Sequence, residues 1–170
     1  MSRLSEAKGI IECITLLERL QKEGFTAHLH LAGSIEPDAR KHIEAAIKKH
    51  GEKIILHGFV SGAEKDSFFR EIDFFLFPTR YHNETQGIVN LEAMSFGVPV
   101  IAFDRCCIGS DAEGGGGLAI PPTDDYVEAA AAFISDAMST MREKRALARE
   151  RFDYLLNHSS REIDELIGEL

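Results

Sequence analysis

The chain has 170 residues, of which 44% are hydrophobic, and its 28 acidic and 19 basic side chains give a net charge of -9. This length and composition predict a single domain, residues 1–170, with a substantial core. The negative charge disfavours nucleic acid as a partner. There is no apolar run of about 18 residues and no secretion signal, and three cysteines do not suggest a disulfide framework. We therefore expect a cytoplasmic protein.

Short apolar runs alternate along the chain with longer segments of helical periodicity, which is the pattern of βα units around a parallel sheet. The predicted strands are 28–33, 53–59, 73–78, 98–104 and 117–122. The predicted helices are 6–23, 37–50, 62–72 and 87–96, followed by further helices after N-caps at Thr123 and Asp124. This order predicts an α/β fold: a Rossmann-like, doubly wound parallel sheet with helices on both faces and C-terminal helices.

The start of the chain departs from this pattern. A doubly wound sheet should have a strand that leads into the first helix, yet only the letters MSR precede the helical segment LSEAKGIIECITLLERL. We therefore expect that the first strand is truncated and that the chain begins inside a larger protein.

The stretch ETQGIVNLE places Glu84 and Glu92 eight residues apart, after a strand that a proline ends. Loops at the carboxyl ends of parallel strands bind ligands in open α/β sheets. Gly87 permits a close approach of the backbone, and the helix that begins there aims the free N–H groups of Ile88 and Val89 at whatever lies beside Glu84. The pattern predicts an anion site.

Glu92 lies within the apolar run GIVNLEAMSFGVPVIAF. A carboxylate in such surroundings must be paired or hydrogen-bonded, and sugar or ribose hydroxyls would satisfy it. The alternative is that Glu92 forms a salt bridge with a nearby Lys or Arg and that Glu84 is a solvated loop residue. Upstream, Ser61 and Glu64 have the spacing of a capping box at the start of a helix.

In this context ETQGIVNLE resembles the E-x7-E motif of family 4 of the retaining glycosyltransferases, which have the two-domain GT-B fold. Other segments resemble the motifs of that family in the same order: SRLSEAKG, LHLAGSIEPD, ILHGFVSGAEK, EAMSFGVPVIA and GLAIPPTD. The resemblance covers nearly the whole chain and corresponds to the C-terminal, donor-binding domain. It implies that the N-terminal domain, which carries the acceptor site, is absent from this chain.

The resemblance assigns catalytic roles to three residues. Arg3 and Lys8 match the basic residues that contact the donor diphosphate, where two cations stabilise the charge that develops on the leaving group. Glu84 matches the glutamate that contacts sugar hydroxyls near the reacting carbon. Glu92 matches the glutamate that binds the ribose hydroxyls.

The remaining donor contacts follow from the same resemblance. Gly87, Ile88 and Val89 match the turn whose backbone meets sugar and phosphate, and the neighbouring Thr85 and Gln86 are further predicted donor contacts. Gln86 stands where the family usually has an aromatic residue.

The segment that flanks the nucleobase corresponds to Val60 and Ser61. Some relatives that use GDP-sugars have Asp where this chain has Gly62, and its absence favours UDP weakly over GDP. A second departure is that Cys106, Cys107 and Ser110 replace the glycine pair and glutamate of many relatives.

The resemblance implies transfer of a hexose from a nucleotide-sugar to a glycan or lipid-linked acceptor, in polysaccharide or lipopolysaccharide biosynthesis, with the isolated domain inactive or nearly so. It leaves open a homodimer and peripheral association with the inner face of the membrane. The alternative is a noncatalytic nucleotide-sugar-binding or regulatory module that acts with a separate chain. A GT-B epimerase is a weaker rival, because it would lack the combination of Arg3, Lys8, Glu84 and Glu92.

We expect no metal and no cofactor, since the nucleotide-sugar is a substrate. His28 and His30 alternate in a predicted strand and would share a face, but no third ligand stands near them in sequence. The basic stretch REKRALARER is predicted to be an amphipathic surface helix, with a membrane-surface patch as the alternative.

Overall fold

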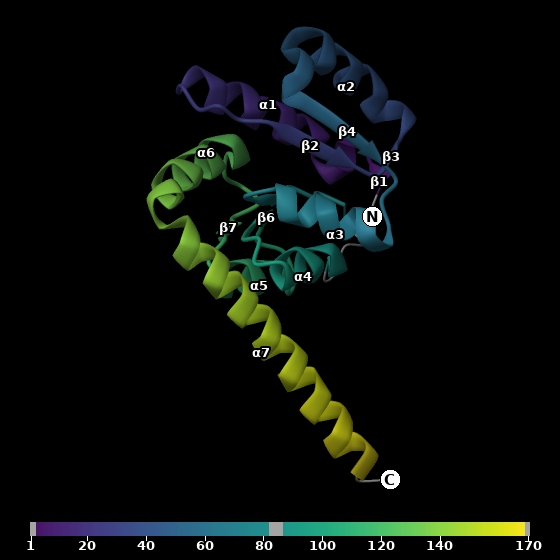
Figure 1. Ribbon diagram of the computed structural model, residues 1–170, viewed down its shortest axis with the longest axis vertical. Helices are drawn as coiled ribbons and strands as arrows, with labels where there is room; N and C mark the ends of the chain where they lie inside the picture. The colour runs from purple at the N-terminus through teal and green to yellow at the C-terminus, as the bar shows by residue number, and fades with distance from the viewer. Residues whose placement is uncertain (1–2, 82–86, 169–170) are drawn as a thin grey trace.

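The computed structural model describes residues 3–81 and 87–168, with side chains through residue 161 (Figure 1). The strands are β1 Arg3–Leu4, β2 Leu29–Ala32, β3 Ser34–Ile35, β4 Ile54–Gly58, β5 Phe75–Phe77, β6 Val100–Phe103 and β7 Leu118–Ile120. The α-helices are α1 Ile10–Lys22, α2 Pro37–His50, α3 Gly62–Glu71, α4 Ile88–Ser95, α5 Ile108–Gly114, α6 Tyr126–Ala137 and α7 Met141–Gly168. Short 3-10 turns are η1 Glu6–Lys8, η2 Gly51–Lys53 and η3 Met138–Thr140.

Every strand pair is parallel, as predicted. β2 pairs with β4, β5 pairs with β6 and β6 with β7, while the two-residue strands β1 and β3 pair with each other. The five predicted strands are confirmed, and β1, β3 and α5 are additions. The strands do not form one continuous hydrogen-bonded sheet, because β2–β4 and β5–β6–β7 form separate ladders.

A cavity of about 340 Å³ separates these two ladders. Its walls include residues 29–31 of β2 and residues 75–77 of β5, with apolar side chains of α1 such as Leu16 and Leu17. In a doubly wound sheet the strand that leads into the first helix lies at this place in the strand order. Truncation of that strand stays a prediction.

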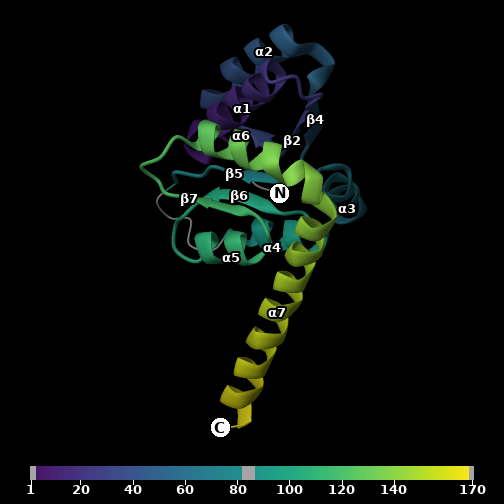
Figure 2. The ribbon, with the colours of Figure 1, turned by 90° about the vertical axis from the view of Figure 1, so that its left-hand side faces the viewer.

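Strand β6 shows why helices must cover both faces of the larger ladder. Side chains alternate along a strand, so Val100 and Ala102 join the core beneath α3, α4, α5 and α7, whereas Ile101 and Phe103 join the core beneath α1 and α6. Figure 2 shows α6 on one side of β5–β7 and α4 and α5 on the other. The predicted Rossmann-like layering is confirmed.

The last helix is continuous over 28 residues and its far end projects away from the domain (Figure 1). Its first half packs on α4 and α5 through the fully buried Ala148. Three arginines of the basic stretch make internal bonds: Arg145 to Asp73, Arg149 to the Ser95 carbonyl and Arg151 to Asp111. Part of the predicted surface helix therefore fastens α7 to the domain. None of the helices in residues 3–81 and 87–168 is both long and apolar enough to cross a membrane.

Candidate functional site

The first motif is fixed against the carboxyl end of β5 by a glycine. Gly9 has φ 82°, and a Cβ there would lie 2.4 Å from both Cγ and the carbonyl oxygen of Pro78. The Arg80 N–H donates to the Ala7 carbonyl at 2.9 Å. Gly9 therefore ends η1 and divides the helix predicted over 6–23, and the backbone that carries Lys8 lies at the edge of the sheet where ligands bind.

Lys8 and Arg3 occupy different surroundings within this motif. The Lys8 Nζ lies 5.7 Å from the centre of the Phe77 ring and 5.2 Å from that of Tyr81, which holds its charge beside the end of β5. The Arg3 side chain is 72% exposed, and its Nε lies 3.9 Å from Glu36 Oε1. Both residues line the cavity between β2 and β5, together with Val89.

The start of α4 is pinned to the same place by a second glycine. Gly87 is the N-cap residue of α4 with φ 60°, and a Cβ there would lie 2.7 Å from Asn90 Nδ2 and 2.9 Å from Phe77 Cε1. Ile88, the first residue of the helix, is 69% exposed. The first N–H groups of α4 have no intrahelical partner, and they therefore lie next to the Phe77 ring. Lys8 lies over the same ring.

Asn90 is a feature of this site that the sequence analysis missed. It is 2% exposed, and within residues 3–81 and 87–168 neither Nδ2 nor Oδ1 has a hydrogen-bond partner. A buried amide without partners costs about 1–3 kcal/mol per unsatisfied group. The available signal was an asparagine in the otherwise apolar first turn of the helix.

Glu92 forms the salt bridge that the alternative interpretation anticipated. Lys65 Nζ of α3 donates to Glu92 Oε1 at 2.7 Å, and the two side chains are 26% and 33% exposed. The bond joins α3, which begins at the segment predicted to flank the nucleobase, to α4, which begins at the turn predicted to meet the phosphate. Lys65 is a further residue that sequence reasoning missed, although it stands last in the quoted segment ILHGFVSGAEK.

The segment predicted to flank the nucleobase lies at the start of α3. Val60 is buried, and Ser61 is the exposed N-cap residue. The predicted capping box is wrong, because the Ser61 side chain makes no cap bond and the Glu64 N–H donates to the Ser61 carbonyl at 3.2 Å instead.

Three predicted donor contacts, Glu84, Thr85 and Gln86, lie outside the described residues. Of the loop after β6, Cys106 and Cys107 are exposed, and Cys106 has φ 48°. A positive φ is uncommon for cysteine, so this loop has a backbone shape that glycine would adopt more readily.

The fold is that of a Rossmann-like domain, and solved structures with the same fold are glycosyltransferases of the GT-B type. HepE from Anabaena in complex with UDP-glucose aligns with a TM-score of 0.75 and 20% identity over 99% of this chain and 48% of that one. The pneumococcal O-GlcNAc transferase GtfA, in complex with UDP and GlcNAc, aligns with a TM-score of 0.74 and 19% identity over 98% of this chain and 35% of that one. The C-terminal domain of a group 1 glycosyl transferase, LpcC from Francisella tularensis, aligns with a TM-score of 0.73 and 21% identity over 92% of this chain and 82% of that one.

The chain belongs to the family described as glycosyl transferases group 1, whose model matches residues 1–151. It corresponds in fold to the C-terminal half of a GT-B enzyme and spans about half the length of HepE. No curated protein matches the chain.

Proposed function

We propose that this chain is the donor-binding domain of a retaining glycosyltransferase, which transfers a hexose from a UDP-sugar to a glycan or lipid-linked acceptor. The observation that carries the proposal is the meeting of two motifs at the end of β5. Gly9 against Pro78 and Gly87 against Phe77 bring Lys8 and the start of α4 to the same strand end. Membership of the family and the UDP-bound relatives support the same reading.

The chemistry asked of these groups is stabilisation of a leaving diphosphate. Breaking the glycosyl bond places additional negative charge on the phosphate, and a lysine with a helix N-terminus favours that charge more than it favours the intact donor. The local arrangement also provides a way for a chain of net charge -9 to hold an anion. Glu92, oriented by Lys65, would accept hydrogen bonds from the ribose hydroxyls.

Gly62 supports UDP over GDP. It has φ 51°, a backbone conformation that glycine adopts at little cost and that most other residues avoid. Aspartate, which some GDP-sugar relatives have at this position, tolerates a positive φ better than most side chains, so the preference for UDP rests on the missing carboxylate and not on backbone strain.

Calorimetric titration with UDP, GDP and ADP in the presence of EDTA tests this proposal. UDP should bind most tightly, and Lys8→Met should weaken it by about tenfold or more through loss of a charged contact to phosphate. Lys41→Met, at an exposed lysine of α2, is the control and should leave affinity unchanged. Equal binding of UDP by wild type and Lys8→Met would reject the assignment. Retention is tested on the protein joined to an acceptor domain, by the anomeric configuration of its product.

A further inference from the structure

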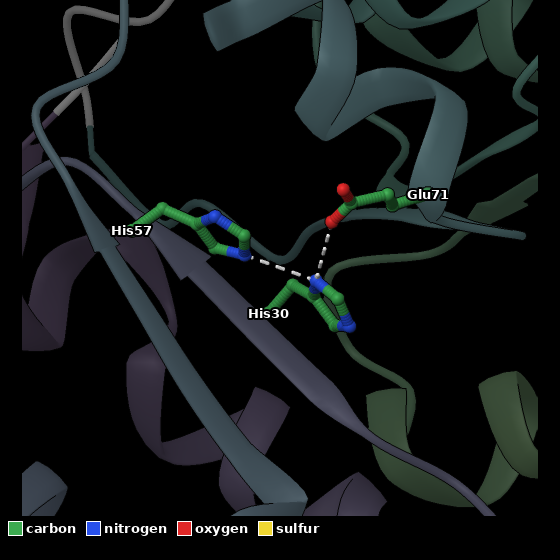
Figure 3. Close-up of side chains that lie close together, drawn as sticks. All are labelled: His30, His57 and Glu71. Atoms are coloured by element: carbon green, nitrogen blue, oxygen red, sulfur yellow. Dashed lines mark hydrogen bonds and ion pairs between the residues drawn. The ribbon is translucent and has the colours of Figure 1, made fainter.

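A second group of polar side chains lies beneath α3 (Figure 3), and two of its members, His30 and Glu71, line the same cavity as Arg3 and Lys8. It combines His30 of β2, His57 of β4 and Glu71, the last residue of α3. His30 Nδ1 lies 3.0 Å from His57 Nε2 and 3.9 Å from Glu71 Oε2. One ligand atom of each residue lies within 4.8 Å of the other two.

These separations match the ligand shell of a small divalent cation. A tetrahedral zinc ion with bonds of about 2.0–2.1 Å holds neighbouring ligand atoms about 3.3 Å apart. The distances of 3.0 and 3.9 Å from His30 Nδ1 lie on either side of that value, and the third pair, His57 and Glu71, lies within 4.8 Å, so the three side chains would have to shift to close around an ion. Two histidines and one glutamate are also a known ligand set for zinc, with water in the fourth position.

The electrostatic surroundings favour a cation at this point. Glu71 ends α3, where the helix dipole is negative and an uncompensated carboxylate is disfavoured. His30 Nδ1 faces Oε2 of this carboxylate at 3.9 Å, so a cation held between the two side chains would compensate the charge of Glu71.

We propose that His30, His57 and Glu71 bind one divalent transition metal ion of the zinc type. The site shares no residue with the proposed donor contacts. This proposal departs from the sequence-based expectation of no metal, and it gives the ion no part in sugar transfer. Its role is to fasten the carboxyl end of α3 to β2 and β4. Since α3 also carries Lys65, the ion would hold in place the helix that orients Glu92.

The structure also corrects which histidines belong together. The sequence analysis weighed His28 with His30, but His28 Nε2 contacts Lys53 Nζ at 3.2 Å. His30 instead pairs with His57, and the two rings stack with their centres 5.1 Å apart. His28 thus provides a matched control, being a histidine of the same segment that lies outside the cluster.

The test is titration of the chelator-stripped 170-residue chain with Co²⁺, followed by visible absorption and by displacement with Zn²⁺. We expect one equivalent with the intense spectrum of tetrahedral Co²⁺. His30→Ala, His57→Ala and the half-exposed Glu71→Gln should each lower the affinity by more than about 100-fold, the upper range for loss of a supporting group. His28→Ala should leave it unchanged.

Two results would overturn the proposal: no stoichiometric Co²⁺ spectrum for folded wild type, or equal binding by wild type and Glu71→Gln. Circular dichroism establishes that each variant is folded. UDP titration of the same variants in EDTA separates this proposal from the donor-site proposal, because a Glu71→Gln chain should lose the metal and keep UDP.

Discussion

The donor-side residues and the histidine cluster are both groups of polar side chains, but they are encoded in different ways. Lys8 and the start of α4 are each marked by an adjacent glycine. Gly9 and Gly87 have positive φ angles and lie so close to neighbouring atoms that a side chain would not fit. His30, His57 and Glu71 come from three elements and share no motif or regular spacing. Local backbone requirements mark the first group in the sequence, and tertiary packing alone assembles the second.

Helix α3 links the two groups. Its first turn presents Lys65 to Glu92 and its last residue, Glu71, faces His30. Changes that affect one group and spare the other therefore test whether the groups are independent.

The largest expected effect comes from Gly9→Ala. The new Cβ would meet Pro78 at 2.4 Å in a left-handed backbone, so strain and overpacking should together cost about 3–4 kcal/mol. Gly24→Ala is the matched control: its φ is 91° but nothing lies within 4 Å, and about 1–2 kcal/mol is expected. Urea unfolding measures both. Equal losses for the two variants would mean that the contact with Pro78 does not hold the first motif.

The second effect concerns the helix that supports the donor-side residues. Arg151 of α7 bonds to Asp111 of α5 at 3.1 Å, with side chains 22% and 8% exposed. Asp111→Ala should cost about 2–3 kcal/mol, because it leaves a largely buried guanidinium unpaired. Asp153→Ala breaks an exposed pair with Arg149 and should cost less than about 0.5 kcal/mol. Thermal unfolding should separate the two variants clearly, and similar melting temperatures would contradict this account of α7.

The histidine cluster should reveal itself through pH. Since the pKa of His30 is lower in the folded chain, the unfolded chain takes up a proton more readily, and the free energy of unfolding should fall as pH drops below about 6.5. One proton contributes at most about 1.4 kcal/mol per pH unit. His57 and His28 act in the same direction on this pKa, whereas Glu71 opposes them.

Urea unfolding in EDTA between pH 5.5 and 7.5 measures this effect, with pH values set around the ordinary histidine range of about 6.5. Burial is the largest cause of the lower pKa and His28 the smallest, so His30→Gln should reduce the slope and His28→Gln should change it little. A slope that is the same in all three chains would remove His30 as its source.

The smallest effect concerns the cavity between the two ladders. Cys13 lines it, and burial raises the pKa of this thiol to about 12. A protonated, buried thiol is unreactive, so a disulfide reagent at pH 8 should label the exposed Cys106 and Cys107 quickly and Cys13 only after unfolding. Rapid labelling of three thiols in the folded chain would show that solvent reaches this cavity.

Sequence patterns predicted the elements whose signals are local. The strands from 28–33 to 117–122 were found because buried parallel strands are short apolar runs between turn residues. The two-residue strands β1 and β3 and the seven-residue α5 are too short for a periodic signal. The predicted N-caps Thr123 and Asp124 are wrong: the N-cap of α6 is Asp125, whose side chain accepts from the N–H groups of Val127 and Glu128. Several adjacent residues in PTDD have capping chemistry, so the sequence does not single out one of them.

The site was predicted in the same uneven way. Lys8 and Gly87 belong to contiguous motifs, and the structure places both beside Phe77. Lys65 and Asn90 could not be assigned, because their importance depends on which helix faces them.

The most direct test is a crystal structure of the chain with UDP. The account predicts that diphosphate oxygens lie within hydrogen-bond distance of Lys8 Nζ and the N–H groups at the start of α4, with the ribose hydroxyls on Glu92. UDP bound elsewhere, with Lys8 remote from the phosphates, would contradict the central claim that the two glycine-pinned motifs form one donor site.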